Sequence, residues 1–112
     1  MKKIEVIIKP EKLEDLKSLL EKNGVTGLMV TNIMGYGNQK GYTQIYRGVK
    51  YSVNLLPKLK VETVVPDENC DELVKKIQLA VSTNSIGDGK IFIYNVEDAV
   101  RIRTGEHGEN AI

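Results

Sequence analysis

Four short segments in which apolar and polar residues alternate place the strongest constraint on the fold of this chain. Residues 3–9 show the pattern most clearly, because Ile4, Val6 and Ile8 fall on one face of an extended chain and Glu5 on the other. Comparable segments follow at residues 28–34, 59–65 and 90–95. We therefore expect a strand at each of these segments.

Segments with the spacing of amphipathic helices separate these strands. Pro10 opens the first, whose leucines repeat on one stripe until Asn23-Gly24, where glycine tolerates the left-handed backbone of a helix C-terminus. The second begins at Asp67, the expected N-cap, and continues its apolar stripe to Val81. The order βαββαβ predicts an α+β ferredoxin-like sandwich, with both helices on one face of an antiparallel four-stranded sheet.

The sheet face turned away from the helices would be too apolar to remain in water. Its residues would be Glu5, Ile7, Met29, Thr31, Ile33, Glu62, Val64, Phe92 and Tyr94. Because a continuous area of this kind is normally buried between subunits, we predict a closed homo-oligomer. Residues 1–112 suit a single domain, and residues 100–103 are expected to add a short fifth strand.

Composition argues against several classes of protein. The formal net charge is +1, so no global attraction to nucleic acid or membrane is expected, and no apolar segment is long enough to span a bilayer. A single cysteine and a start without a signal peptide favour a cytoplasmic location. His107 is the only histidine, and Cys70 lies on an apolar helical stripe. No His-based triad or zinc cluster is therefore expected, and we predict a protein that is not an enzyme.

Two glycine-rich segments have features of phosphate-binding loops without matching a known motif. Residues 86–90 (IGDGK) follow a helix and precede a strand, the reverse of a P-loop, and residues 35–41 have the wrong spacing for a dinucleotide fingerprint. Their glycines would still let backbone N–H groups approach an anion, with Lys90 adding charge. Arg101 and Arg103 would point to one side of an extended segment and suit a polyphosphate. A turn with two solvated arginines is the alternative that this spacing leaves open.

Residues 37–57 form a connection far longer than the usual length of about 4–6 residues. The segment contains no acidic residue and is rich in glycine, tyrosine and basic side chains. A loop this long in a compact domain is usually functional or disordered. We favour a functional loop over a floppy hairpin tip.

The chain resembles the PII nitrogen-regulatory signal-transduction proteins along essentially its whole length. The matching segments are MKKIEVIIKPEKL, GYGNQKGYTQIYRGVKY, LLPKLKVETVVPD and TNSIGDGKIFIYNVEDAVRIRTGE. The resemblance implies a homotrimer of ferredoxin-like subunits. Each would extend a long T-loop (about residues 37–57) and would have a phosphate-binding loop (about 83–90) and a C-terminal segment (about 101–112).

By this resemblance, ATP or ADP binds between neighbouring subunits, with Arg101 and Arg103 reaching in from the neighbour. The implied nucleotide-binding residues are Ile7, Met29, Gly37, Asn38, Gln39, Val64, Gly87, Asp88, Gly89, Lys90, Arg101 and Arg103.

The resemblance also implies 2-oxoglutarate as an effector, chelated to a Mg ion on the ATP phosphates. Gln39 would be the protein side chain that binds the Mg ion, through a neutral oxygen suited to magnesium. Lys58 would pair with the distal carboxylate, and the backbone at Lys40, Gly41 and Gly87 would complete the site. Because Gln39 lies at the base of the T-loop, ligand binding would control the conformation of that loop.

The family regulates partners through the T-loop, which implies an ammonium channel and nitrogen-metabolism enzymes or regulators here. Arg47 is the candidate partner contact and Tyr51 the possible modification site. Direct binding to nucleic acid is not implied, and a membrane would be met only through a channel partner. Asn38 stands where the family often has arginine, and Val49 and Lys50 stand where it has a small residue and an acid.

Two other functions are consistent with a ferredoxin-like chain. One is a trimeric metal- or amino-acid-binding regulatory module that uses the same sheet face, although it would leave IGDGK and the paired arginines unexplained. The other is a small ferredoxin-like hydrolase, for which the sequence offers no positioned general base.

Overall fold

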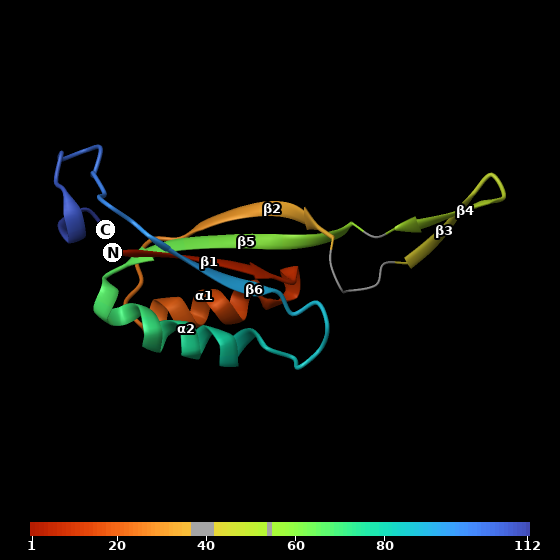
Figure 1. Cartoon of the computed structure of the whole chain (residues 1–112), viewed down its shortest axis with the longest axis horizontal. Coiled ribbons are helices and arrows are strands. Elements are labelled where there is room, and N and C mark those ends of the chain that lie inside the picture. Colours follow the sequence, from red (N-terminus) through yellow and green to blue (C-terminus); the bar gives the residue numbers. More distant parts are fainter. Residues whose placement is uncertain (37–41, 54) are drawn as a thin grey trace.

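The computed structural model of the chain describes residues 1–36, 42–53 and 55–112. Within these residues, an antiparallel four-stranded sheet has the strand order β2-β5-β1-β6. Its strands are β1 (Lys2–Ile8), β2 (Met29–Gly35), β5 (Leu56–Val65) and β6 (Lys90–Asn95). The helices α1 (Leu13–Lys22) and α2 (Asp67–Val81) cover one face of this sheet (Figure 1). The arrangement confirms the predicted α+β fold with βαββαβ order.

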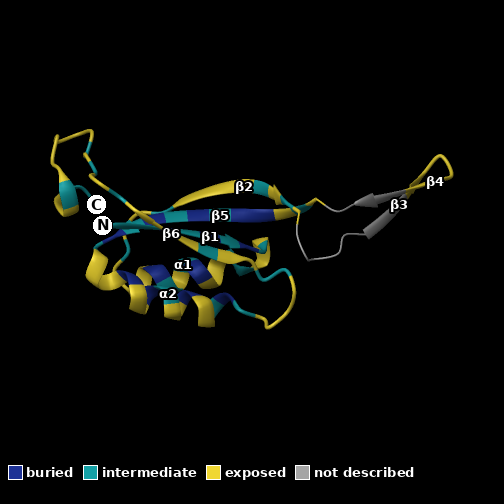
Figure 2. Ribbon diagram, in the orientation of Figure 1, coloured by how far each residue is buried: buried dark blue, intermediate teal, exposed yellow. Residues whose placement is uncertain are grey.

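The core lies between the sheet and the helices (Figure 2). Ile4 and Ile8 of β1 are buried against Leu16 and Leu20 of α1 and Ile77 of α2, all in one cluster. These residues follow the two-residue period in the strand and the helical period in the helices, as the sequence predicted. Burial of each large side chain contributes about 1.5–3 kcal/mol relative to leaving it exposed.

The two ends of α1 follow from its local sequence. A 3-10 turn, η1 (Pro10–Lys12), precedes the helix, because proline suits a first turn in which its missing N–H costs no hydrogen bond. At the other end, Asn23 is the C-cap and Gly24 has a φ of +76°, so the predicted stop is confirmed.

The expected N-cap role of Asp67 is wrong. Pro66 occupies the cap position in an extended conformation, and Asp67 is already the first helical residue of α2. Its carboxylate lies 2.8 Å from the amino group of Met1. The acid still lies in the first turn, where negative charge interacts favourably with the helix dipole.

The long connection after β2 contains a hairpin that the sequence analysis did not predict. β3 (Tyr42–Tyr46) pairs with β4 (Val49–Val53) and projects well beyond the sheet (Figure 1). Arg47 and Gly48 form its two-residue turn with φ values of +50° and +76°, the signs of a type I′ turn. In addition, β5 begins at Leu56, three residues earlier than the expected start.

The expected fifth strand at residues 100–103 is absent from the described part of the chain, where Val100 makes only an isolated bridge with His107. The backbone turns instead, and the Gly105 N–H donates to the Arg101 carbonyl at 2.7 Å. A short 3-10 turn, η2 (Gly108–Ala111), follows. No helix among the described residues is long and apolar enough to cross a membrane.

Candidate functional site

A pocket of about 560 Å³ opens beside the loop that joins α2 to β6. We call it the glycine-loop pocket. It is lined by Ile7, Gly35, Tyr36, Leu56, Lys58, Ser85, Ile86, Gly87, Asp88, Gly89, Lys90 and Phe92. The structure thus brings together residues from β1, β5, β6 and the IGDGK loop, including five of the residues predicted to bind nucleotide.

Glycine is required at position 89 by the close approach of two backbone segments. A Cβ on Gly89 would lie 2.8 Å from the carbonyl carbon of Ile7 and closer still to its oxygen. The φ of Gly89 is +108°, a backbone conformation that residues with a side chain rarely adopt. Gly87 has a φ of +95°, and its carbonyl accepts a hydrogen bond of 2.7 Å from Lys58 Nζ. The loop is therefore held against both β1 and β5.

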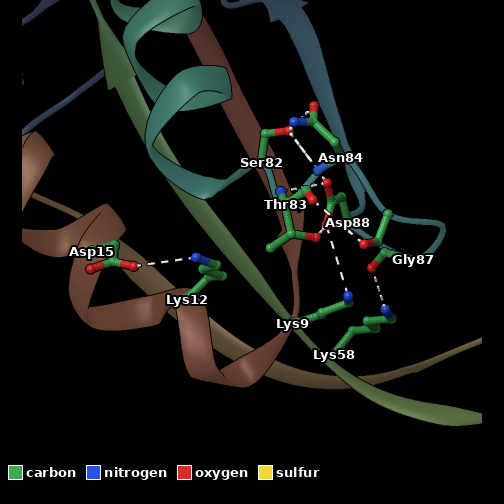
Figure 3. A network of polar contacts seen from close by, with 10 residues as sticks. Lys9, Lys12, Asp15, Lys58, Ser82, Thr83, Asn84, Gly87 and Asp88 are labelled. Atoms are coloured by element: carbon green, nitrogen blue, oxygen red, sulfur yellow. Dashed lines mark hydrogen bonds and ion pairs between the residues drawn. The ribbon is translucent and has the colours of Figure 1, made fainter.

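Asp88 stabilises the same loop from within (Figure 3). Its carboxylate accepts hydrogen bonds from the Thr83 backbone N–H, at 2.7 Å, and from the Thr83 hydroxyl. Lys9 is the residue that follows β1, and its Nζ lies 3.8 Å from Asp88 Oδ1. The Thr83 hydrogen bonds are the main reason why the pKa of Asp88 is lowered to about 2. Asp88 is thus ionised at neutral pH, with both carboxylate oxygens engaged by Thr83.

Lysines give the pocket its positive character. The side chain of Lys58 is buried, and this burial, followed by the nearby charge of Lys9, lowers its pKa from the usual value. Lys90 begins β6, where it pairs with Ile7 in the strand register. Cations around a glycine-rich turn are the arrangement that suits an anionic ligand.

Another pocket, of about 700 Å³, lies near the opposite end of β5. We call it the tail pocket, because the C-terminal residues Glu109, Ala111 and Ile112 form part of its lining. Met29 and Val64, both predicted to border a nucleotide base, lie in this pocket together with Glu62. The predicted base contacts and the predicted phosphate contacts are therefore not brought together within one chain.

Arg101 and Arg103 are also separated from the glycine-loop pocket. Figure 1 shows the C-terminal segment at the end of the sheet opposite the α2–β6 loop. The predicted extended segment that would carry both guanidinium groups is wrong, because residues 101–105 form a turn. The Arg101 side chain instead lies 3.5 Å from Glu106.

Several predicted residues lie outside the described part of the chain: Gly37, Asn38, Gln39, Lys40 and Gly41. Tyr51 belongs to β4. Arg47 lies at the exposed tip of the hairpin, with its guanidinium 5.3 Å from the centre of the Tyr46 ring.

Sequence reasoning missed Lys9 and Thr83 as the residues that contact Asp88 of the glycine-rich loop. The motif TxxxGD, over residues 83–88, was a signal for Thr83, since a threonine hydroxyl can hydrogen-bond to a nearby carboxylate. Nothing in the sequence signalled Lys9, because its position near Asp88 depends on where β1 ends.

Cys70 and His107 have structural positions. Cys70 is buried in the core, and this burial raises the pKa of its thiol, as expected for an inert cysteine. His107 Nδ1 lies 2.8 Å from Asp98. In the described ranges, no three His, Cys, Asp or Glu side chains form a group that could hold a metal ion.

A ferredoxin-like sheet with a lysine-flanked glycine loop and a projecting hairpin defines a small α+β protein suited to binding an anionic ligand. Comparison with known proteins identifies the family. The family model described as nitrogen regulatory protein P-II matches residues 1–106, and the chain belongs to this family.

Curated relatives agree along the full length. The chain is 54% identical to nitrogen regulatory protein P-II of Pasteurella multocida and 53% identical to that of Haemophilus influenzae, each over 100% of both chains. It is 51% identical to nitrogen regulatory protein P-II 1 of Escherichia coli strain K12, again over 100% of both chains.

Proposed function

We propose that this chain is a PII-type signal-transduction protein that binds ATP or ADP between the subunits of a homotrimer. It also senses 2-oxoglutarate and regulates nitrogen-metabolism partners through its T-loop. Membership of the P-II family supports the regulatory role. The protein acts in the cytoplasm and is not an enzyme.

The division of the predicted nucleotide contacts between two pockets is the observation that supports binding between subunits. Lys58 and Val64 are six residues apart on β5, which corresponds to about 20 Å along a strand. Residues predicted to contact the phosphates line the glycine-loop pocket, and residues predicted to contact the base line the tail pocket. A neighbouring copy that places its tail pocket against the glycine loop would complete the site.

The phosphates of the nucleotide would occupy the glycine-loop pocket. Lys90 supplies a positive charge there, and the backbone of Gly87 to Gly89 can approach an anion without interference from side chains. The carboxylate of Asp88 does not oppose this binding, because Thr83 and Lys9 already engage it. Arg101 and Arg103 would reach these phosphates from the neighbouring subunit.

The effector 2-oxoglutarate would bind next to the phosphates. Lys58 is buried at the wall of the glycine-loop pocket, where a carboxylate would find a partly desolvated cation. Gln39 would bind the Mg ion that links the effector to ATP. The backbone at Lys40, Gly41 and Gly87 would surround the rest of the molecule.

The hairpin would carry the signal to partners, among them an ammonium channel and nitrogen-metabolism enzymes or regulators. Ile45, Tyr46 and Val49 are 70%, 60% and 53% exposed on it, and Arg47 lies at its tip. Exposed apolar and aromatic side chains with a central arginine are typical of residues that contribute strongly to protein interfaces. Tyr51 is the candidate site of covalent modification.

Titration calorimetry tests the proposed ligands. Mg-ATP should bind to the purified protein, and 2-oxoglutarate should bind only when Mg-ATP is present. Absence of nucleotide binding would refute the nucleotide part of the proposal. Absence of 2-oxoglutarate binding at saturating ATP would refute the sensing of this effector alone. Sedimentation equilibrium should give three times the chain mass of 12.5 kDa.

A further inference from the structure

The C-terminal segment forms a loop that is closed at its base by Asp98 and His107. His107 Nδ1 lies 2.8 Å from one carboxylate oxygen of Asp98. The other oxygen accepts hydrogen bonds from the backbone N–H groups of Ala99, at 2.8 Å, and Gly108, at 3.1 Å. The carboxylate of Asp98 therefore joins the two sides of the loop at its base. We call the Asp98–His107 pair the clasp.

Backbone hydrogen bonds continue from the clasp to the tip of the loop. The Gly108 N–H donates to the Ala99 carbonyl at 2.9 Å, and the Arg101 N–H donates to the Glu106 carbonyl at 2.9 Å. The tip is a turn in which Gly105 has a φ of +73°. Arg101 and Arg103 both belong to this tip, so the closed base determines where their backbone lies.

Polar contacts, more than apolar burial, hold this loop closed. The two large apolar side chains near the tip, Val100 and Ile102, are 53% and 101% exposed. Glu106 accepts a hydrogen bond of 2.8 Å from the Thr104 hydroxyl and lies 3.5 Å from the Arg101 guanidinium. A loop with little buried apolar surface is expected to open when its base contact is lost.

The hydrogen bond fixes the proton on the His107 ring. The pKa of Asp98 is lowered, with the hydrogen bond from His107 as the largest cause, so Asp98 is ionised and can only accept at neutral pH. Nδ1 must therefore be the donor. A neutral ring would therefore carry its proton on Nδ1 while the clasp is closed.

We propose that Asp98 and His107 are positioning residues for nucleotide binding: by closing the loop of residues 98–108 they present Arg101 and Arg103 to phosphates bound by the neighbouring subunit. The inference rests on the proposed function, since it needs a nucleotide between subunits. The clasp itself does not contact the nucleotide. It acts through the two arginines.

Calorimetry with Mg-ATP on three variants tests this role. His107→Ala should weaken ATP binding by about threefold to fivefold, a modest loss because the pair is about half exposed. His107→Asn should recover most of the affinity, because its side-chain N–H can donate to Asp98 from nearly the position of Nδ1. Asn110→Ala, an exposed change just beyond the loop, should bind ATP as the unaltered protein does.

The same change in a second background separates positioning from a general structural effect. If the clasp acts through the arginines, His107→Ala should have no further effect on ATP affinity when Arg101 and Arg103 are both alanine. A further threefold loss in that background would overturn the inference, as would unchanged ATP affinity in His107→Ala alone.

A spectroscopic measurement tests the clasp without any ligand. His107 is the only histidine, so its ring nitrogens give a single set of NMR signals. The neutral ring should carry its proton on Nδ1, and Asp98→Asn should abolish this preference. A ring protonated on Nε2 in the unaltered protein would refute the clasp, whereas absence of ATP binding to that protein would refute the proposed function.

Discussion

Replacement of Gly89 by alanine should damage the glycine-loop pocket through a direct clash with the backbone of β1. The added Cβ would lie 2.8 Å from the carbonyl carbon of Ile7, where no real Cβ is found. Backbone cannot yield as a flexible side chain can, so either β1 or the loop must move. Ile7 also pairs with Lys90 in the sheet, and a shift of either segment would disturb that pairing.

The expected loss of stability is the sum of two effects. An alanine held at a φ of +108° costs about 1–3 kcal/mol in backbone strain. Overpacking against the β1 backbone adds about 1–3 kcal/mol. Gly89→Ala should therefore lower the free energy of unfolding by about 2–6 kcal/mol, a large share of the ~5–15 kcal/mol typical of a domain.

Gly24→Ala is the matched control. Gly24 has a φ of +76°, but nothing lies within 4 Å of an added Cβ. Its cost should be limited to left-handed strain of about 1–2 kcal/mol. Urea unfolding followed by circular dichroism, at one protein concentration for all samples, measures both variants. Calorimetry on the folded protein should show weakened ATP binding for Gly89→Ala.

Equal stability of the two variants would refute the argument from close approach. Unchanged ATP affinity in Gly89→Ala would refute the assignment of the phosphates to this loop, even if the stability loss is as expected.

Three further predictions concern charge and ligand contacts. Lys90→Ala and Arg103→Ala should each weaken ATP binding by about 1–3 kcal/mol, because a charged hydrogen bond to phosphate is lost. Calorimetry measures this loss and should show none for Lys75→Ala, an exposed change on α2. Gln39→Ala should abolish the 2-oxoglutarate response while ATP binding is largely kept; parallel loss of both would mean that Gln39 is structural. The pKa of Asp88 is lowered from 3.8 to about 2, so its contribution to stability is complete above about pH 4 and is lost as the pH falls towards 2. Unfolding measured across this range should show a smaller pH dependence in Asp88→Asn, and an unchanged profile would contradict the role of the Thr83 hydrogen bonds.

Local sequence predicted the regular elements well, because their signals lie within a few residues. The alternation at residues 3–9 and the stop at Asn23-Gly24 depend on neighbours along the chain, and both were confirmed. The hairpin of β3 and β4 was missed because its turn places Arg47 at a positive φ, where asparagine or glycine is the usual signal. Asp67 was misplaced by one residue because Pro66 takes the cap position itself.

The sequence by itself determined the order of strands and helices, the core stripes and the glycine-rich loop, since each follows from periodicity or from the conformational freedom of glycine. Tertiary structure alone decided which residues share a pocket. Lys9 reaches Asp88 only because β1 ends beside the α2–β6 loop. Met29 and Val64 lie apart from Lys90 because the two pockets lie near opposite ends of β5. Arg101 and Arg103 turn away from an extended path because hydrogen bonds between residues 98 and 108 close a loop, and these long-range contacts leave no periodic trace in the sequence.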